Sequence, residues 1–530
     1  MTGGPPEDAG LEPGAAAPPP GGGETPAAPP HEDLGDRLLR QTLPFPTGPE
    51  PSPRTALETV RDNLEAIAFA LVLALLLRHF AIEVFKIPTS SMEPTLFGDH
   101  PGSPGDRILV DKTAYLLRDP ARWDVVVFHY PLDWSRNFIK RVVGRPGEAL
   151  RIERGDVWTG TWDGRGTPSV HPSRKPRRVR EQLYVPLYPP SQSKSFGPAT
   201  DWWREEPRGA APFRVLGHGR FVYDGDATGS AGRSAPWASL RYGYAVRDTD
   251  TRDRDPRSAD TNYLLVPDVR LRCTVVADGE AEVEITWDPG DGRLHAIRLA
   301  TEGRTASEAR TRNASRAIKE RLVPGRPLDV ELESVDGDLR AWVDGDEVVV
   351  LPDEIPLAEA ARLEQEGEGT QRQRLEITVR GARVEFRDVR LDHDLYYTNH
   401  RADPSNRVPP RETPYVLGSD EFFMLGDNTR SSSDSRRWRA SGTRLKDGRT
   451  IWYDPAERDW SWTGQGPDRR KQVTDIEGVT RRWTPEEEEE SAADSREMPV
   501  VKRDRIIGRA WFALVFWPLD KAWSRVRFIH

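Results

Sequence analysis

The residues best suited to chemistry stand in one short run, "IPTSSMEPTL", from Ile87 to Leu96. Because proline fixes φ and disfavours helix in the residue before it, the two prolines predict an extended or turned segment. Such a stiff loop would present its hydroxyls as a nucleophile requires, although a cluster of this composition is more often an ordinary loop. A serine hydroxyl also needs a base to remove its proton near neutral pH. A catalytic role for this segment therefore depends on whether another part of the chain supplies a suitable basic side chain.

The strongest candidate base is Lys140, in "NFIKRVVGRPGE". Phe138 and Ile139 precede it and two valines follow Arg141, which predicts an apolar strand. Burial on such a strand disfavours the ammonium form and lowers the lysine pKa. A general base works best with a pKa of about 7 or 8. Lowering the lysine pKa to this value from about 10.4 requires that the charged form be destabilised relative to the neutral form by roughly 3 to 5 kcal/mol. The alternative is a Lys-Arg pair on an exposed strand.

Other catalytic patterns receive no support. No GxSxG elbow occurs, which argues against an α/β-hydrolase. The string "SQSK", Ser191 to Lys194, matches SxxK, but that motif needs a helix and this segment is rich in proline. No CxxC or HExxH pattern indicates a metal site, so no cofactor is expected, and a lone Cys273 excludes an internal disulfide. The net charge of -9 argues against a nucleic-acid partner.

The only long apolar run, "LEAIAFALVLALLLRHFAIEVF", lies directly before the hydroxyl cluster. Its uninterrupted centre, Ala66 to Leu77, is shorter than the roughly twenty residues that span a bilayer. The whole run reaches that length if Glu65 and Arg78 extend toward the two interfaces. We therefore predict a transmembrane helix over residues 64–85. A buried helix of a soluble protein is the alternative, and the charges on either side do not fix an orientation.

The rest of the sequence predicts one mainly β domain that is discontinuous in the chain. Residues 1–60 are rich in Pro, Gly and Ala and are expected to be a disordered tail. Short β-rich runs divided by turn residues fill 85–160 and return at 412–438 and 497–524. We expect these three parts to form one β-barrel or folded sheet, separated by insertions.

The first insertion has two halves of different character. Residues 161–260 are rich in Pro, Arg and Trp without a clear period, and we expect them to be irregular. Over 261–398 apolar residues alternate with polar ones, which predicts a β-sandwich with a hairpin turn at Asp344-Gly345. Its strands "LRAWVDGDEVVV" and "VEFRDVRLDHDLYY" resemble those of laminin-G or concanavalin-like jelly rolls. Ligand binding and a spacer role both stay open for the sandwich.

A second insertion covers residues 439–496. It is rich in Trp and contains the acidic run "TPEEEEESAADS". Runs of like charge are usually solvated, so we expect this stretch to be a mobile linker.

Five short segments, taken in order, resemble the bacterial type I signal peptidases, membrane-bound Ser/Lys endopeptidases that remove signal peptides. They are "IPTSSMEPTL", "GDRILVDKTAY", "FIKRVVGRPGE", "MLGDNTRSSSDSRRW" and "IIGRAWF". The resemblance implies a signal-peptidase-like β-barrel core, no metal or organic cofactor, and precursor proteins with Ala-x-Ala-like cleavage sites as substrates. It also implies a single-pass anchor in the cytoplasmic membrane, contact with lipid, and a catalytic domain outside the cytoplasm. Both insertions lie outside the resemblance.

The resemblance assigns roles to individual residues. Ser91 matches the nucleophile and Lys140 its general base. Thr89 matches a hydroxyl that helps the Ser91 backbone N–H to form an oxyanion hole. Ser432 matches a serine that hydrogen-bonds the lysine, but "GDNTRSSS" departs from the family pattern. Its serine neighbours on both sides therefore remain alternatives.

Further residues match supporting positions. Asp434 and Arg436 correspond to a pair that braces the site. The exposed apolar edge near "WFALVFWP" is expected to touch lipid. Shallow apolar pockets for small substrate side chains are expected from Phe85, Ile87, Met92, Leu96, Phe138 and Ile139.

The predicted function is therefore removal of signal peptides by a Ser91/Lys140 dyad at the outer face of the membrane. Two other hypotheses remain. A soluble, self-cleaving repressor-type enzyme would share the dyad. A membrane-tethered binding module would use the sandwich and carry an inactive protease core, although the presence of both dyad residues argues against it.

Overall fold

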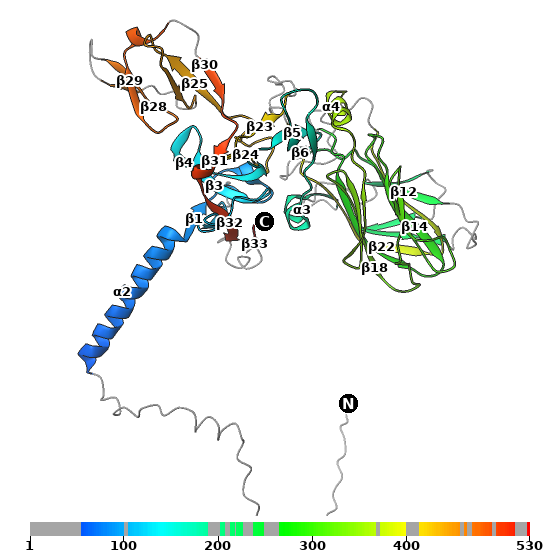
Figure 1. Ribbon diagram of the computed structural model, residues 1–530. Coiled ribbons are helices and arrows are strands. Elements are labelled where there is room, and N and C mark those ends of the chain that lie inside the picture. The colour runs from blue at the N-terminus through cyan, green and yellow to red at the C-terminus, as the bar shows by residue number, and fades with distance from the viewer. Residues whose placement is uncertain are drawn as a thin grey trace, which may run out of the picture. The chain divides into compact units, whose positions relative to one another are not determined.

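The computed structural model describes residues 55–99, 104–188, 202–206, 213–217, 219–225, 237–248, 264–366, 372–398, 413–455, 461–463, 469–489, 494–514 and 527–530. Most of the expected tail over 1–60 and the "SQSK" string lie outside these residues. The described chain consists mainly of β-strands, as predicted (Figure 1).

The apolar run forms one long helix, α2 (Ala56–Phe80), drawn in blue in Figure 1. It ends earlier than predicted, because strand β1 (Ile82–Lys86) begins almost at once and Phe85 is a strand residue. Exposed and partly buried side chains alternate along β1, which is the period of a strand, but the apolar Val84 and Phe85 continued the apolar run in the sequence and concealed it. Among the described helices, none is both long and apolar enough to cross a membrane.

An eight-stranded antiparallel sheet carries the segments on both sides of the insertions. Its order is β1-β2-β32-β3-β4-β24-β31, with β33 paired to β32. The parts of the sequence expected to form one β domain therefore share one sheet, although the pairing of the described strands does not close it into a barrel. Its strands after β1 are β2 (Arg107–Asp111), β3 (Val125–Tyr130), β4 (Asp133–Gly144), β24 (Glu421–Leu425), β31 (Val501–Lys502), β32 (Ile506–Leu514) and β33 (Arg527–Phe528).

A second, four-stranded sheet continues from the first in sequence, in the order β23-β5-β6-β7. Strand β7 lies beyond residue 160, so the first part of the core is longer than predicted. Strand β23 comes after the sandwich and returns to pair with β5. The strands are β5 (Ala149–Glu153), β6 (Asp156–Thr161), β7 (Ser169–Pro172) and β23 (Tyr415–Val416).

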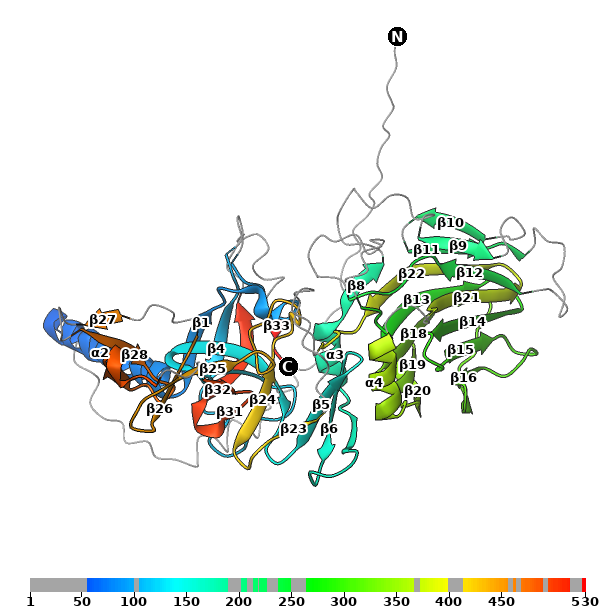
Figure 2. The same ribbon diagram turned by 90° about the horizontal axis from the view of Figure 1, so that it is seen from above.

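The predicted sandwich consists of two antiparallel sheets, which Figure 2 shows from above. The first has the order β10-β11-β22-β13-β18-β19-β20, with β8 paired to β22. The second has the order β17-β16-β15-β14-β21-β12-β9. The first contains β8 (Val185–Tyr188), β10 (Phe213–Gly217), β11 (Arg220–Tyr223), β13 (Val269–Ala277), β18 (Leu328–Val335), β19 (Asp338–Val343), β20 (Asp346–Pro352) and β22 (Val384–His393). The second contains β9 (Trp203–Glu206), β12 (Ala238–Tyr242), β14 (Ala281–Asp288), β15 (His295–Ala300), β16 (Glu308–Arg310), β17 (Ser315–Ala317) and β21 (Arg374–Gly381).

The alternation read from the sequence places the core of the sandwich correctly. Leu271 and Val275 of β13 and Ile285 of β14 are buried in one apolar cluster. The predicted hairpin joins β19 to β20, and both Asp344 and Gly345 have positive φ, as a tight two-residue turn requires.

Residues 161–260 are not wholly irregular, which corrects the expectation from sequence. Helix α3 (Arg177–Leu183) and five strands, β8 to β12, lie within them, and these strands extend both sheets of the sandwich. Trp202, Phe221 and Leu240 are buried in its core. The strands are short and the sequence between them is rich in Pro and Arg, so no period extends far enough to be recognised. A third helix, α4 (Leu357–Glu366), follows β20.

The second insertion is also more ordered than predicted. Two three-stranded sheets form there, and the acidic run begins with the short helix η7 (Pro485–Glu487). Glu488 accepts hydrogen bonds from Lys471 Nζ at 2.7 Å and from the indole of buried Trp483 at 2.7 Å. The start of the acidic run is therefore held in place by hydrogen bonds to Lys471 and Trp483. The strands are β25 (Arg439–Arg444), β26 (Thr450–Tyr453), β27 (Ser461–Thr463), β28 (Arg470–Thr474), β29 (Thr480–Trp483) and β30 (Asp494–Glu497).

The extra strands predict where the sandwich can be cut out of the chain. A fragment of residues 184–398 should unfold cooperatively in urea, whereas 261–398 should not, because the shorter piece lacks the strands that bury Phe221 and Leu240. Circular dichroism during urea titration measures both. Equal midpoints and equal slopes for the two fragments would show that β8 to β12 add nothing to the fold.

Candidate active site

The structure brings the two predicted dyad residues together. Ser91 lies in the short helix η1 (Ser90–Met92), and Lys140 lies on β4. Lys140 Nζ is 2.9 Å from Ser91 Oγ and donates a second hydrogen bond to the Ile139 carbonyl at 2.8 Å. The side chains are nearly buried, with 7% of Ser91 and 4% of Lys140 exposed. A nucleophile and a base within hydrogen-bonding distance are the arrangement that covalent catalysis requires.

Tight packing of its own loop holds Ser91 in place. Met92 is fully buried, and the Leu96 N–H donates to its carbonyl at 2.8 Å. At Gly98 a Cβ atom would come within 2.3 Å of the Thr89 carbonyl carbon, so the loop returns against itself where only glycine fits. The prolines restrict this segment as the sequence indicated, while the glycine permits the close return.

Burial controls the charge of Lys140. Removal from water lowers the lysine pKa to about 8, against the opposing effect of the nearby carboxylates of Asp434 and Asp427, and Arg436 adds a small further lowering. The Phe138 ring centroid lies 5.4 Å from Nζ and supplies part of the apolar surroundings. A substantial fraction of the lysine is therefore neutral near pH 8.

The segment after β24 packs against the back of the nucleophile loop. The Asn428 N–H donates to the Ser91 carbonyl at 3.1 Å. A Cβ atom on Gly426 would meet the same carbonyl oxygen at 2.5 Å and would also clash with Ser432 Oγ. The glycine of the "GDN" sequence is thus required for this close approach.

Of the three adjacent serines, only Ser432 is buried, and the serines on both sides are exposed. This distinguishes Ser432 from the alternatives that the sequence left open. Ser432 Oγ has no hydrogen-bond partner within the described residues, and the hydrogen bonds of Lys140 go to Ser91 and Ile139 instead. The expected bond from Ser432 to the lysine is therefore not formed in this conformation.

Asp434 and Arg436 form a buried ion pair, and their bracing role stays a prediction. Arg436 donates to Asp434 at 2.6 and 2.8 Å, and the Gly426 N–H donates to the same carboxylate at 3.0 Å. Arg436 also reaches the carbonyls of Thr429 and Thr398. The pair connects the turn around Ser432 to the chain that leaves the sandwich.

Thr89 lies beside the nucleophile but is exposed. Its hydroxyl donates to Ser91 Oγ at 3.4 Å, at the long limit of a hydrogen bond. The side chain is thus at the right end of the loop for the oxyanion role, which stays a prediction.

The predicted substrate pockets are corrected in part. Ile87, Met92 and Leu96 are buried in an apolar cluster and form the floor beneath Ser91 rather than an open wall. Phe85 and Ile139 pack on this cluster and stay partly exposed. Sequence alone cannot separate the two roles, because a pocket wall and a core both require apolar residues. Phe138 is partly exposed as well and stacks on Tyr130 at 4.3 Å between ring centroids.

A second buried ion pair, Arg141 with Asp427, was missed at the level of sequence. Arg141 donates to both carboxylate oxygens at 2.9 and 2.8 Å, and both side chains are 0% exposed. Thr95 Oγ1 donates to the same carboxylate at 2.5 Å. The sequence did contain a signal for this pair. Arg141 is a charged residue on an apolar strand, and Asp427 stands in the segment "MLGDNTRSSSDSRRW".

The inserted sandwich reaches this ion pair through the segment that follows β22. Tyr397 Oη is 3.4 Å from Asp427 Oδ1, and the neighbouring Thr398 carbonyl accepts the bond from Arg436. Residues outside the predicted core therefore contact both ion pairs behind the dyad.

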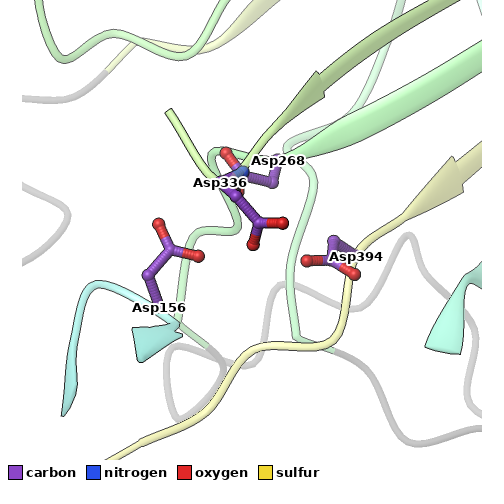
Figure 3. Close-up of side chains that lie close together, drawn as sticks. All are labelled: Asp156, Asp268, Asp336 and Asp394. Atoms are coloured by element: carbon purple, nitrogen blue, oxygen red, sulfur yellow. Dashed lines mark hydrogen bonds between the residues drawn. The ribbon is translucent and has the colours of Figure 1, made fainter. Parts of the chain in front are cut away.

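One cluster of acidic side chains in the described chain has the composition of a metal site. It contains Asp156, Asp268, Asp336 and Asp394, whose carboxylates approach one another in Figure 3. The ammonium of Lys175 is hydrogen-bonded to Asp336 and lies 2.9 Å from Asp394. An internal cation thus already balances part of this charge, and the cluster joins β6 to the sandwich.

Comparison with known proteins agrees with this geometry. Residues 60–186 match the family model described as signal peptidase, peptidase S26. This part of the chain is therefore similar to the signal peptidases. The matched segment contains both Ser91 and Lys140 but neither Asp427 nor the residues after it.

Curated signal peptidases show the same local similarity. "Probable signal peptidase I-1" of Synechocystis is 38% identical over 117 residues, which cover 21% of this chain and 55% of the relative. "Signal peptidase I" of Pseudomonas fluorescens is 45% identical over 93 residues, covering 15% and 31%. The chain thus spans about half the length of such relatives or less. Among solved structures, a Caenorhabditis elegans galectin aligns with 24% of this chain and 80% of its own at 12% identity, with a TM-score of 0.17, too low to support an argument.

The Arg141–Asp427 pair predicts a large stability loss on a small change. Asp427→Asn should lower the free energy of unfolding by about 3 to 5 kcal/mol, because it leaves the Arg141 guanidinium buried without its counter-charge. Urea denaturation measures the loss. Asp119→Asn is the matched control, since Asp119 pairs with Arg503 at the surface and should cost less than about 1 kcal/mol. Similar losses for the two variants would refute a structural role for the buried pair.

Proposed function

We propose that the chain is a serine endopeptidase that removes signal peptides from precursor proteins, with Ser91 as nucleophile and Lys140 as general base. The observation that carries this proposal is the 2.9 Å approach of a buried lysine amine to a serine hydroxyl. The match of residues 60–186 to the signal peptidase, peptidase S26 family model supports it independently.

The geometry supports a two-step acyl transfer. Neutral Lys140 accepts the Ser91 proton while Ser91 Oγ attacks the scissile carbonyl, and the resulting ammonium returns the proton to the departing amine. A water molecule then gives its proton to Lys140, attacks the acyl-enzyme and releases Ser91. The Ser91 backbone N–H and the Thr89 hydroxyl are proposed to stabilise the oxyanion.

The substrate is proposed to carry small residues before the cleaved bond, as Ala-x-Ala-like sites do. Partly exposed Phe85, Phe138 and Ile139 surround the dyad, and the residues beneath Ser91 are closely packed. Large side chains would have to displace this apolar floor. Small ones would rest on it.

We propose further that α2 anchors the chain in the cytoplasmic membrane with the catalytic domain outside the cytoplasm. The side chains of α2 are exposed, including a continuous series of large apolar ones, and such a surface is costly in water. Exposed Trp511 and Phe528, whose ring centroids lie 6.4 Å apart, add an aromatic edge of the kind that favours a lipid interface. The exposed apolar residues of α2 include Leu64, Ile67, Phe69, Leu71, Leu75 and Phe80.

Substitution of either dyad residue should abolish cleavage. Ser91→Ala and Lys140→Ala should each reduce kcat/KM on a model precursor by several orders of magnitude, and the double variant should be scarcely worse because the two residues act as a unit. Lys140→Arg should fail too, since a guanidinium does not release its proton in a protein.

A matched pair of serine variants distinguishes the support residue from its neighbours. Ser432→Ala should lower activity less than loss of the dyad, and Ser433→Ala, at an exposed position, should leave it unchanged.

Normal turnover by folded Lys140→Ala would overturn the mechanism.

The pH dependence follows from the buried amine. Activity should rise as pH increases through an apparent pKa near about 8, because only neutral Lys140 accepts the serine proton. The Asp434 carboxylate raises the lysine pKa, so Asp434→Asn should move this acidic limb to lower pH. A kcat/KM profile tests both, and an unchanged limb in Asp434→Asn would show that another group titrates.

Membrane attachment has its own test. The full chain should stay in the membrane fraction after carbonate extraction, and protease added outside intact spheroplasts should digest residues after Phe85. Protection of these residues in spheroplasts, together with their digestion after lysis, would place the catalytic domain on the other side.

A further inference from the structure

A polar groove crosses the sandwich on the sheet formed by β22, β13, β18 and β19, far in sequence from the dyad. Its volume is about 400 Å³. The residues that line it include two arginines, three carboxylates, one threonine and one tryptophan, namely Arg272, Arg390, Asp329, Glu331, Asp388, Thr274 and Trp342.

Strand register places the two arginines directly opposite each other. Arg272 of β13 pairs with Arg390 of β22, and on its other side it pairs with Glu331 of β18. Glu331 in turn pairs with Trp342 of β19. Like charges directly opposite on neighbouring strands destabilise a sheet. The arginine pair therefore needs a compensating anion.

The protein provides only part of that compensation. Within the described residues Arg390 is exposed and forms no ion pair, while Arg272 reaches one carboxylate, Asp392, at 3.3 Å. Arg272 Nε is buried and has no acceptor among the described atoms, and one oxygen of Glu331, Oε1, is buried there without a donor. An unused donor and an unused acceptor thus lie on facing residues of adjacent strands. Such pairs are normally satisfied by protein, water or ligand.

Further acceptors lie along the same groove. Asp388 has a φ of 51° at the irregularity of β22 between Arg387 and Arg390, where a bulge redirects side chains. Asp329 accepts a hydrogen bond from the Thr274 hydroxyl at 2.6 Å. Trp342 closes one side, with the Arg177 guanidinium 4.7 Å from its ring. The groove therefore offers a cationic centre surrounded by carboxylate acceptors.

We propose that this groove binds an acidic saccharide. The sugar carboxylate would lie on the Arg272 and Arg390 guanidiniums, whose planar donors match a carboxylate. Its hydroxyls would donate to Glu331 and Asp388. An acidic peptide fits less well, because it lacks the hydroxyl groups that a sugar would direct at these acceptors. The proposal does not depend on the peptidase activity of Ser91 and Lys140.

Binding by the full chain in detergent tests the proposal. The probes are oligosaccharides of galacturonate, of glucuronate and of N-acetylneuraminate, their neutral counterparts and triglutamate, each titrated by calorimetry up to millimolar concentration. At least one acidic saccharide should bind, the neutral sugars and triglutamate should bind at least about tenfold more weakly, and Arg390→Gln should weaken binding at least about tenfold.

Arg387→Gln is the matched control, because Arg387 stands on the same strand, pairs with Glu385 at 2.7 Å and is not among the groove residues. It should bind as the wild type does. Arg272→Gln is a second test and should also weaken binding, with thermal unfolding showing that each variant is folded. Absence of binding by every acidic saccharide, equal affinity for the neutral sugars or triglutamate, or equal affinity of Arg390→Gln and wild type would each overturn the proposal.

Discussion

The burial of one lysine amine is the constraint on which the proposed active site depends. An ammonium removed from water is costly, so its pKa falls, and a neutral amine next to Ser91 becomes accessible near pH 8. The surroundings limit the shift of the lysine pKa, because Asp434 and Asp427 favour the charged form while Arg436, the partner of Asp434, offsets part of that effect. The two buried ion pairs thus adjust the base as well as hold the loops behind it.

That burial requires contact between segments hundreds of residues apart. Strand β4 supplies Lys140, the loop before β2 supplies Ser91, and the turn after β24 covers both from behind. The closest approach occurs at Gly426, where any side chain would strike the Ser91 carbonyl. The sandwich contributes at the same place through Tyr397 and Thr398. An insertion that looks separate in sequence is therefore in contact with the rear of the site.

The features that could be predicted were those with a local signal. The alternating strands of the sandwich and its Asp344-Gly345 hairpin follow from period and turn chemistry, whereas the pairing of Ser91 with Lys140 was expected from the family resemblance. Buried and exposed serines could not be told apart, because Ser432 and its neighbours are chemically identical until a tertiary contact covers one of them. The same reason explains the missed Arg141–Asp427 pair, whose members are 286 positions apart. The short strands of residues 161–260 gain their order from edges of sheets that form elsewhere in the chain.

The position of β32 has a consequence for the order of events during synthesis. This strand lies between β2 and β3, so these two early strands have no neighbour on that side until residues 506–514 leave the ribosome. The sandwich, whose strands end at His393, can fold well before then, because domains fold as units as the chain emerges. The nascent catalytic sheet keeps two open edges throughout that interval. The proposed active site can therefore be completed only after β32 has been synthesised, and those edges are where a chaperone would be most useful.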